Sequence, residues 1–408
     1  MNKVELLAPA GSLEKLKYAI AYGADAVYIG GEAFSLRVAA KNFSNEEIKE
    51  GVDFAHQRGK KVYIAANIFP HNKDLDEYRE YMKEINDIGV DGVIISDLGA
   101  FAIAKEAAPD LEIHVSTQAN NINYMSARMW YQLGAKRVVL AREMSFEEIK
   151  EIREKIPEDM EIECFVHGAM CISYSGRCLL SNYMTERDSN QGACSHPCRW
   201  KYNLVEEQRP GEYMPVYEND RGTFIFNSKD LCMIEYIPEI INSGISSLKI
   251  EGRVKNELYV ATVVKAYREA LDKYYEDPDN YEFDPEWLNE LKNISHRRYT
   301  TGFYMGKPSG NEQVYDSSTY IQEYITVAVV KDYNPETKEA TLEQRNRFFK
   351  GDEVEFITPG EAISKYKIEY MCDEEGNEVE VAPHPKQIVK IKTDAALTEY
   401  SIVRMKKA

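Results

Sequence analysis

Residues 5–31, ELLAPAGSLEKLKYAIAYGADAVYIGG, contain a complete strand–helix–strand unit. An apolar run from Glu5 to Gly11 precedes an amphipathic helical stretch, and a second apolar run spans Ala26 to Gly31. Gly23 stands at the expected end of the helix, a position that favours a residue tolerant of positive φ. Two strands joined through a helix predict a parallel sheet. The first turn, residues 8–12, is not a glycine-rich phosphate loop.

The same unit recurs along the first 150 residues, and a seventh and an eighth strand follow at residues 162–168 and 246–251. Capping boxes at Ser44 and Ser145 open two of the helices. Eight such units close a parallel sheet, so we predict an α/β fold, a TIM-like (β/α)8 barrel over residues 1–275. A doubly wound open sheet is the alternative, but no GxGxxG follows the first strand. The other predicted strands are residues 61–68, 92–98, 112–119, 137–143, 162–168 and 246–251.

Three regions fall outside this repeat. A long cysteine-rich insertion, residues 170–244, separates strands seven and eight and begins at the carboxyl end of a barrel strand, the face where barrel enzymes hold their active sites. A linker and irregular region, residues 276–322, carries one short helix near 285–293. Residues 323–408 then alternate strands with turns, which predicts a small antiparallel β-barrel. Its predicted strands are residues 324–330, 339–342, 352–357, 367–371 and 388–391.

Composition narrows the class of protein. The chain has 408 residues, 44% of them hydrophobic, which is typical of globular domains. No apolar run is long enough for a membrane span, and the start lacks the apolar core of a signal peptide, so we expect a cytoplasmic protein with no membrane contact. The net charge of −18 disfavours a general basic surface for nucleic acid, although local basic patches remain possible.

Five of the seven cysteines lie between residues 164 and 198. In a cytosolic chain such a cluster indicates metal or redox chemistry rather than disulfides. Thiolates suit an iron–sulfur cluster or zinc, and the absence of paired CxxC motifs favours the former. Single buried cysteines of the core are the alternative interpretation. The predicted ligands are Cys171, Cys178, Cys194 and either Cys232 or Cys198.

Polar residues gather where the predicted barrel strands end. His114, Ser116 and Gln118 alternate along the fifth strand and would share one face. His167 is the candidate general acid–base. An equally weighted alternative is that His167 only donates a hydrogen bond to a group next to the metal centre. Together, these polar residues at the strand ends predict a pocket for an anionic substrate. The alternative interpretation is a buried network of hydrogen bonds and ion pairs. The other substrate-binding candidates are Arg142, Glu143, Lys249, Glu251 and Arg253.

Several motifs together resemble one known family. Residues 163–171, ECFVHGAMC, and 176–181, GRCLLS, look like the signature of the collagenase-like peptidases of unknown catalytic type, peptidase U32. Residues 7–11, 23–28 and 248–253 (LAPAG, GADAVY and LKIEGR) are similar to that family as well.

The resemblance implies a function as well as a fold. The branch with an added C-terminal β-domain consists of oxygen-independent hydroxylases that form 5-hydroxyuridine at the tRNA wobble position, with a 4Fe–4S cluster and prephenate, a dicarboxylate, as oxygen source. It implies Cys171, Cys178, Cys194 and Cys232 as ligands, with Cys198 as the extra thiol. The family name implies a peptidase instead, although HExxH is absent. A metal-stabilised scaffold without activity is a third interpretation, and the oligomeric state is left open.

A tRNA partner needs basic and aromatic contacts. Residues 199–202 and 296–299 interleave the two kinds of side chain, although solvated surface explains either alone. A basic end on the C-terminal domain is the predicted docking surface, formed by Lys386, Lys390, Lys392, Arg404, Lys406 and Lys407.

Overall fold

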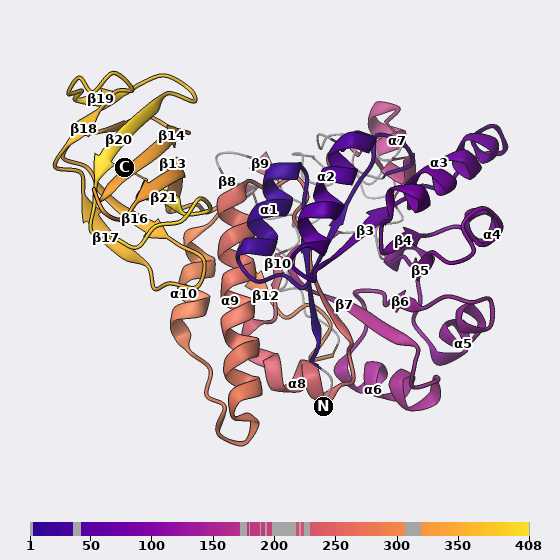
Figure 1. The fold of residues 1–408 in the computed structure, drawn as a ribbon. Coiled ribbons are helices and arrows are strands. Elements are labelled where there is room, and N and C mark those ends of the chain that lie inside the picture. Colours follow the sequence, from indigo (N-terminus) through magenta and orange to yellow (C-terminus); the bar gives the residue numbers. More distant parts are fainter. Residues whose placement is uncertain are drawn as a thin grey trace.

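The computed structural model describes residues 3–35, 42–171, 178, 180–187, 189–191, 194–197, 218–219, 222–223, 229–306 and 320–407. Eight parallel strands form a closed barrel, as predicted, because β11 pairs with both β1 and β7. Figure 1 shows the barrel with its surrounding helices. Its strands are β1 (Glu5–Pro9), β2 (Ala26–Ile29), β3 (Lys61–Ala65), β4 (Gly92–Ile95), β5 (Glu112–Val115), β6 (Arg137–Val139), β7 (Glu161–Ala169) and β11 (Ser247–Ile250).

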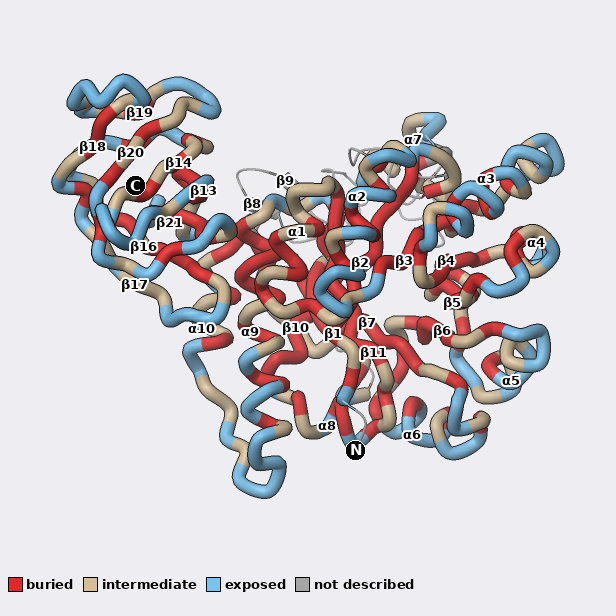
Figure 2. Tube along the Cα trace, in the orientation of Figure 1, coloured by how far each residue is buried: buried red, intermediate tan, exposed pale blue. Residues whose placement is uncertain are grey.

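Helices cover the outside of the barrel and bury their apolar faces against it. Figure 2 shows buried strands at the centre and exposed outer faces on the helices. The capping boxes at Ser44 and Ser145 form as predicted. No helix in the described ranges is long and apolar enough to cross a membrane. The helices are α1 (Leu13–Ala21), α2 (Asn45–His56), α3 (Leu75–Ile88), α4 (Leu98–Ala107), α5 (Tyr124–Gln132), α6 (Phe146–Lys155), α8 (Ile237–Asn242) and α9 (Glu257–Glu276).

The end of β7 extends beyond the barrel and supports the cysteine-rich insertion. There β10 (Asp230–Cys232) pairs antiparallel with β7, and β12 (Tyr299–Thr300) pairs parallel with β10. The described part of the insertion also contains α7 (Leu180–Thr185), which lies at the top of the view in Figure 1, and the short pair β8 (Glu218–Asn219) and β9 (Gly222–Thr223).

The C-terminal region is an antiparallel β-domain that follows α10 (Pro285–Asn293). The predicted strand 367–371 is wrong: the chain forms two separate short strands there, β17 and β18. The sequence interpretation also missed β21, which pairs with both β13 and β16 inside the main sheet. The strands are β13 (Tyr324–Asn334), β14 (Glu339–Gln344), β15 (Phe348–Phe349), β16 (Glu353–Ile357), β17 (Ser364–Lys367), β18 (Met371–Cys372), β19 (Val381–Ala382), β20 (Ile388–Lys392) and β21 (Ile402–Lys406).

The β-domain packs directly on the barrel's helices. The hydroxyl of Tyr22, after α1, donates to the carbonyls of Ile357 (2.7 Å) and Tyr400 (3.0 Å). Lys265 of α9 donates to the carbonyl of Glu361 at 2.7 Å. Side chains from the β-domain, Ile357 among them, belong to the same hydrophobic core as the barrel. The two parts are therefore joined by buried contacts.

Candidate active site at the carboxyl end of the barrel

Arg142 and Glu251 meet across the end of β7. Arg142 follows β6 and donates to the carbonyl of Ala169 at 2.7 Å, while its Nη2 lies 3.4 Å from Glu251 Oε2. Its guanidinium carbon lies 3.8 Å from the centroid of the Phe165 ring. Both charged side chains keep a small exposure, 13% and 14%. The Arg142 guanidinium, predicted to bind substrate, is therefore held in place by an ion pair with Glu251 at the rim of the barrel.

Arg253 and Glu143 are the other predicted charged contacts at this rim. Arg253 is buried, and its Nη1 donates to Ser35 Oγ at 2.7 Å, which ties the end of β11 to the segment after β2. A Cβ on Gly30 would lie 2.4 Å from that Nη1, so glycine makes room for the guanidinium. Glu143 is half-buried and directly follows Arg142 in the chain.

Lys249 lies inside the barrel rather than at its rim. Its Nζ is 2.5 Å from Glu163 Oε1 and 4.5 Å from the centroid of the Tyr28 ring. Arg137 bonds the same Glu163 at 2.9 Å and Glu5 at 2.7 Å. Burial raises the pKa of Glu163, but Lys249 and Arg137 outweigh it and hold that pKa below the usual value. Arg137 also pairs with Glu161 at 2.6 Å, so both cations are held by carboxylates, which favours the buried network for Lys249.

Ser116 and Gln118 lie in a group of uncharged polar side chains that Asn67 and Ser96 complete, and we call these four residues the amide cluster. Asn67 Nδ2 donates to Gln118 Oε1 at 3.1 Å and to Ser116 Oγ at 3.5 Å. Ser96 Oγ lies 3.1 Å from the backbone carbonyl oxygen of Asn67 and 3.3 Å from Gln118 Oε1. Asn67 and Ser96 are not among the predicted site residues: they fall within the predicted strands 61–68 and 92–98, whereas in the structure Ser96 directly follows β4 and Asn67 lies two residues after β3.

The prediction that the fifth strand runs to residue 119 is wrong. β5 ends at Val115, and residues 117–119 form a 3-10 turn capped by Ser116, whose Oγ accepts from the Gln118 N–H at 3.4 Å. Such a local side-chain bond offers the backbone an alternative to the strand. His114 consequently lies deeper, in the barrel interior, with its ring centroid 4.6 Å from that of Tyr63.

His167 is enclosed at the end of β7, where it pairs with Cys232 of β10 in the antiparallel register. It is 1% exposed, and its Nδ1 has no hydrogen-bond partner within the described ranges. Burial, followed by the charges of His296 and Lys255, lowers the pKa of His167 to about 3. The imidazole is therefore neutral at pH 7 and a weak proton acceptor. Three tyrosine rings surround it, with centroids 5.5 to 6.0 Å away: Tyr259, Tyr267 and Tyr299.

The predicted ligand thiols differ in burial. Cys171 is exposed just beyond β7, Cys178 and Cys194 are half-buried in the insertion, and Cys232 is buried on β10. The alternative ligand, Cys198, lies outside the described residues.

Two of these sulfurs accept hydrogen bonds from backbone amides. The N–H of Leu180 lies 3.4 Å from Cys178 Sγ, and the N–H of His196 lies 3.4 Å from Cys194 Sγ. Amide donors stabilise negative charge on sulfur and tune metal–thiolate centres. The surroundings of both thiols therefore suit a thiolate ligand.

Helix α7 holds these two cysteines in one unit. Ser181, three residues after Cys178, accepts from the Ser195 N–H at 2.9 Å, and the two hydroxyls also lie 2.9 Å apart. Ser195 directly follows Cys194. The insertion thus joins two predicted ligands that are separated in the sequence.

Cys232 is the least accessible of the proposed ligands. Burial raises the pKa of the Cys232 thiol to about 12. Cys232 lies opposite His167 of β7, and Cys171 follows His167 by four residues along the chain. Within the described ranges, no group of three or more His, Cys, Asp or Glu side chains is arranged to hold a metal ion. The donor chemistry of Cys171, Cys178 and Cys194 fits a thiolate-bound group, whereas Cys232 is a buried neutral thiol.

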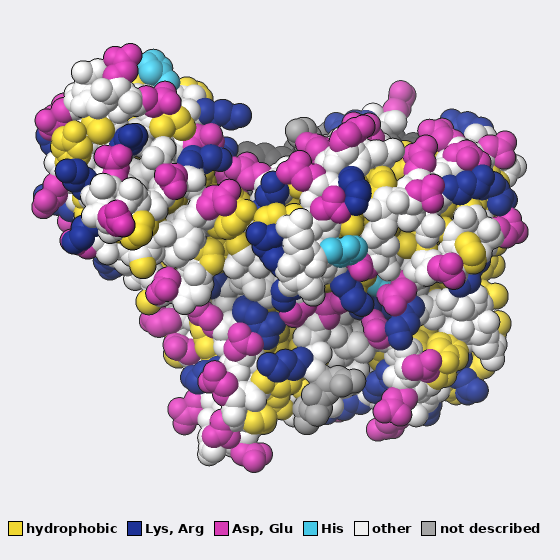
Figure 3. All heavy atoms as spheres, viewed as in Figure 1, with side chains coloured by type: hydrophobic (Ala, Val, Ile, Leu, Met, Phe, Trp, Pro, Cys, Tyr) yellow, Lys and Arg dark blue, Asp and Glu magenta, His cyan; other side chains and the backbone are white. Residues whose placement is uncertain are grey.

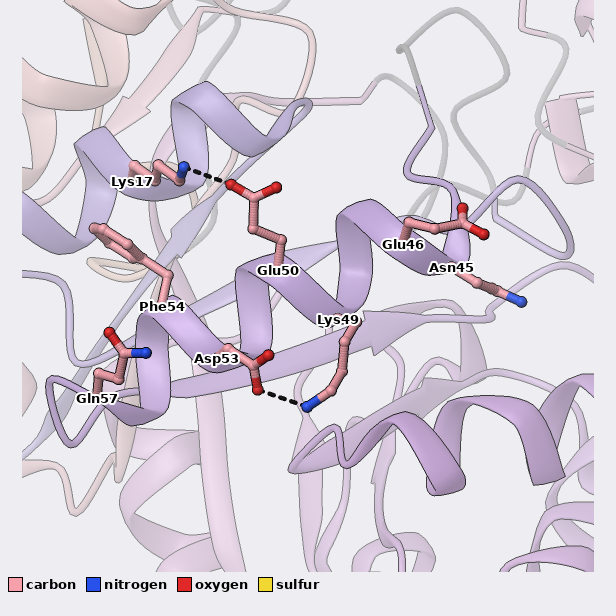
Figure 4. A pocket seen from close by; sticks show the side chains of 8 residues that line it. All are labelled: Lys17, Asn45, Glu46, Lys49, Glu50, Asp53, Phe54 and Gln57. Atoms are coloured by element: carbon pink, nitrogen blue, oxygen red, sulfur yellow. Dashed lines mark hydrogen bonds and ion pairs between the residues drawn. The ribbon is translucent and has the colours of Figure 1, made fainter.

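A surface groove between α1 and α2 is distinct from this region. Figure 4 shows its lining side chains, and two ion pairs occupy it: Lys17 with Glu50 at 2.7 Å and Lys49 with Asp53 at 2.6 Å. Both lysines of the groove are paired, Glu46 adds one more negative charge, and no Ser, Thr or Cys is among the side chains that line it. It offers no catalytic chemistry.

The predicted RNA contacts have mixed outcomes. Residues 199–202 lie outside the described residues. His296 and Arg297 are buried rather than on the surface, with Arg297 Nε 3.3 Å from Asp230 Oδ1. Arg404 does not belong to a basic surface, because it is 1% exposed and bonds Glu290 and Glu355. Figure 3 shows acidic and basic side chains interspersed over the visible face of the β-domain.

Comparison with known families assigns the class. The model of Peptidase family U32 matches residues 11–314, and the model of the Peptidase family U32 C-terminal domain matches residues 322–404. The chain belongs to peptidase family U32, in agreement with the resemblance of its motifs.

Individual relatives have two kinds of name. The chain is 47% identical to tRNA hydroxylation protein P1 of Bacillus subtilis, with 99% of this chain and 95% of that protein covered. It is 39% identical to tRNA hydroxylation protein P of Escherichia coli, with coverage of 94% and 92%. It is 33% identical to a collagenase of Porphyromonas gingivalis, with coverage of 76% and 75%. A solved C-terminal domain from Geobacillus thermoleovorans, described as that of a U32 peptidase, is 45% identical over 20% of this chain and 98% of its own, with a TM-score of 0.19.

Proposed function

We propose that this protein hydroxylates tRNA, forming 5-hydroxyuridine at the wobble position without molecular oxygen. The observation that carries the proposal is 47% identity to tRNA hydroxylation protein P1 over 99% of the chain, which includes both the barrel and the β-domain. The cytoplasm, where tRNA is modified, is the proposed location.

A 4Fe–4S cluster is the proposed cofactor, with zinc as the alternative. Cys171, Cys178 and Cys194 would bind it together with Cys232 or Cys198, and the amide donors on Cys178 and Cys194 support this assignment. When bound, such a cluster supplies one-electron redox chemistry. For Cys232 to be a ligand, its thiol must lose its proton, and its surroundings must open toward the insertion.

Prephenate, a dicarboxylate, is the proposed oxygen source. Arg142 and Arg253 are the cations at the barrel rim, and arginine binds carboxylates in a bidentate manner. Arg142 pairs with Glu251 and Arg253 donates to Ser35, and a bound carboxylate would replace or join these partners. Lys249 is committed to Glu163 in the interior, so we propose for it a supporting role beneath the substrate.

The β-domain is the proposed tRNA-docking module. Because Arg404 is buried, it is not part of the predicted basic docking surface. The lysines that remain as candidates for tRNA binding are Lys386, Lys390, Lys392, Lys406 and Lys407. Lys390 contributes less, because it lies 3.2 Å from Glu339. Binding through these residues predicts a steep dependence on salt.

Peptidase activity is the second candidate function. The Porphyromonas gingivalis relative named collagenase motivates it, and Cys194 Sγ lies 3.9 Å from His196 Nδ1, a thiol beside an imidazole. It predicts hydrolysis of denatured collagen that persists through further purification and is lost in His196→Ala. A preparation whose proteolysis disappears on purification rules it out.

Deleting the gene tests the substrate. We expect 5-hydroxyuridine-derived nucleosides to disappear from total tRNA, measured by liquid chromatography and mass spectrometry, and to return with the wild-type gene. Unchanged nucleoside levels in the deletion strain would contradict the proposal.

Iron and sulfide analysis of anaerobically purified protein tests the cofactor. We expect about four irons and four sulfides per chain, lost in Cys171→Ala, Cys178→Ala and Cys194→Ala. Comparing Cys198→Ala with Cys232→Ala identifies the fourth ligand, and Cys164→Ala, a core cysteine on β7, is the matched control. A colourless protein with one zinc, or with no metal, would exclude the cluster.

A further inference from the structure

The amide cluster and the charged pair occupy different halves of the barrel rim. Asn67, Ser96 and Gln118 follow β3, β4 and β5, which are consecutive neighbours in the sheet and lie side by side in Figure 1. Arg142 and Glu251 follow β6 and β11 on either side of β7. The three side chains after β3, β4 and β5 are therefore uncharged, whereas the two after β6 and β11 form an ion pair.

Hydrogen bonds fix the orientation of the Asn67 amide. Its Nδ2 lies between two acceptors, Gln118 Oε1 at 3.1 Å and Ser116 Oγ at 3.5 Å. Ser96 Oγ lies 3.3 Å from the same Gln118 Oε1 and 3.1 Å from the backbone carbonyl oxygen of Asn67, and its single hydroxyl proton serves one of these two acceptors. Rotating the Asn67 amide would set two carbonyl oxygens against each other, so Nδ2 faces the cluster and Oδ1 faces away from it.

Asn67 Oδ1 is left without a donor. It is buried and has no hydrogen-bond partner among the residues that the structure describes. A buried acceptor without a partner is unfavourable and is usually satisfied by water or a ligand. A ligand that satisfies it must present an N–H or O–H group and must tolerate an uncharged surface.

We propose that Asn67 recognises the target base by accepting a hydrogen bond from N3–H of uracil, an inference that rests on the proposed function. The imide edge of uracil carries N3–H between two carbonyls, whereas cytosine has an acceptor at N3. Reading an extruded base through its Watson–Crick edge is a common strategy of base-modifying enzymes. Asn67 thus selects uridine over cytidine.

The same orientation places the reacting carbon toward the ionic half. C5 belongs to the C5–C6 edge of uracil, across the ring from the C2–N3 edge, so an imide edge held at β3 to β5 turns the C5–C6 edge toward β6, β7 and β11. That side carries Arg142 and Glu251 and is where the cysteine-rich insertion begins. The division of the rim therefore separates recognition of the base from binding of an anionic co-substrate.

Binding of anticodon stem–loops to full-length, anaerobically purified protein tests the inference without turnover. We compare a loop with uridine at the wobble position with the same loop carrying 3-methyluridine or cytidine there. We expect wild type to prefer uridine by about 10-fold, the effect of one buried hydrogen bond. In Asn67→Leu, which has a similar shape but no acceptor, we expect binding of the uridine loop to weaken about 10-fold and the preference to vanish.

Two further variants keep the test decisive. Asn67→Asp retains an acceptor, and with the Gln118 amide turned so that Nε2 donates to the new carboxylate it should keep the preference for uridine over 3-methyluridine. Asn45→Leu, on the outer surface of α2, should bind like wild type. A preference that survives in Asn67→Leu, or that wild type lacks, overturns the role of Asn67. If the loops are discriminated but tRNA from a deletion strain keeps its 5-hydroxyuridine, base recognition stands and the proposed hydroxylation fails.

Discussion

Glu163 is fully buried in the barrel, and Lys249 and Arg137 both bond it. Replacing Glu163 with Gln leaves two buried cations with one carboxylate fewer. We expect Glu163→Gln to lower the free energy of unfolding by about 3–5 kcal/mol, as measured by urea denaturation. Glu161→Gln is the matched control, because Glu161 bonds the same Arg137 but keeps 30% exposure, and its effect should stay below about 1 kcal/mol. Equal losses in the two variants would contradict the account of the network.

His114 makes stability depend on pH. Burial and then the charge of Arg137 lower the pKa of His114, whereas the unfolded chain takes up a proton there near pH 6.5. Stability from the neutral imidazole is thus present above about pH 6.5 and is lost as the pH falls below it. We expect His114→Phe to flatten this decline, by up to about 1.4 kcal/mol per pH unit, in urea titrations between pH 7 and 5. His384→Phe, at an exposed position, should leave the decline unchanged.

The polar residues at the rim could be recognised from sequence, but their partners could not. Arg142 and Glu251 each end a predicted strand, yet their pairing depends on the closure of the barrel. The alternation of β11 places Lys249 on the lumen side, but only the fold brings Glu163 within 2.5 Å of it. Asn67 could not be singled out from sequence because it falls inside the predicted strand 61–68, and only the structure ends that strand at Ala65.

At the scale of elements, Gly168 controls how β7 meets β11. Its φ is +108°, and a Cβ there would lie 2.5 Å from the carbonyl oxygen of Glu251. Gly168→Ala therefore adds a backbone clash to the strain of positive φ. Gly376→Ala is the control, with φ of +88° but open space around it, and should cost about 1–2 kcal/mol.

We expect Gly168→Ala to lower the thermal midpoint clearly more than Gly376→Ala does, as measured by differential scanning calorimetry. Because Glu251 would have to move, the affinity for the proposed dicarboxylate co-substrate should fall as well. Equal shifts in the two variants would show that the β7–β11 junction adapts without strain.

Strand beginnings were predicted better than strand ends. The run at residues 112–119 reads as one strand because His114, Ser116 and Gln118 alternate along it, but the Ser116 side chain caps a 3-10 turn and the strand ends at Val115. β21 was missed for a different reason: Arg404 and the lysines near it resemble a polar tail. Only the ion pairs with Glu290 and Glu355 make an arginine compatible with an inner strand.

At the scale of the whole molecule, Arg404 couples the β-domain to α10. Its guanidinium bonds Glu290 of α10 at 2.6 Å and Glu355 of β16 at 2.7 Å. Arg404→Met removes both bonds and leaves two carboxylates together, of which Glu290 keeps 24% exposure. We expect a loss of about 2–3 kcal/mol and earlier unfolding of the β-domain in calorimetry.

Arg345→Met is the control for this coupling. Arg345 also joins the β-domain to the barrel, through Glu14 of α1, but its side chain is 20% exposed. We expect it to cost less than about 1 kcal/mol and to leave a single transition. Indistinguishable melting profiles for the two variants would exclude Arg404 as the main ionic link.

The most direct measurement is the reaction itself. Cluster-containing protein, tRNA from the deletion strain and prephenate are incubated without oxygen, and the nucleosides are analysed by mass spectrometry. The account predicts 5-hydroxyuridine that requires prephenate and is absent with Cys178→Ala. Protein with a complete iron and sulfide content that forms no 5-hydroxyuridine under these conditions would contradict it.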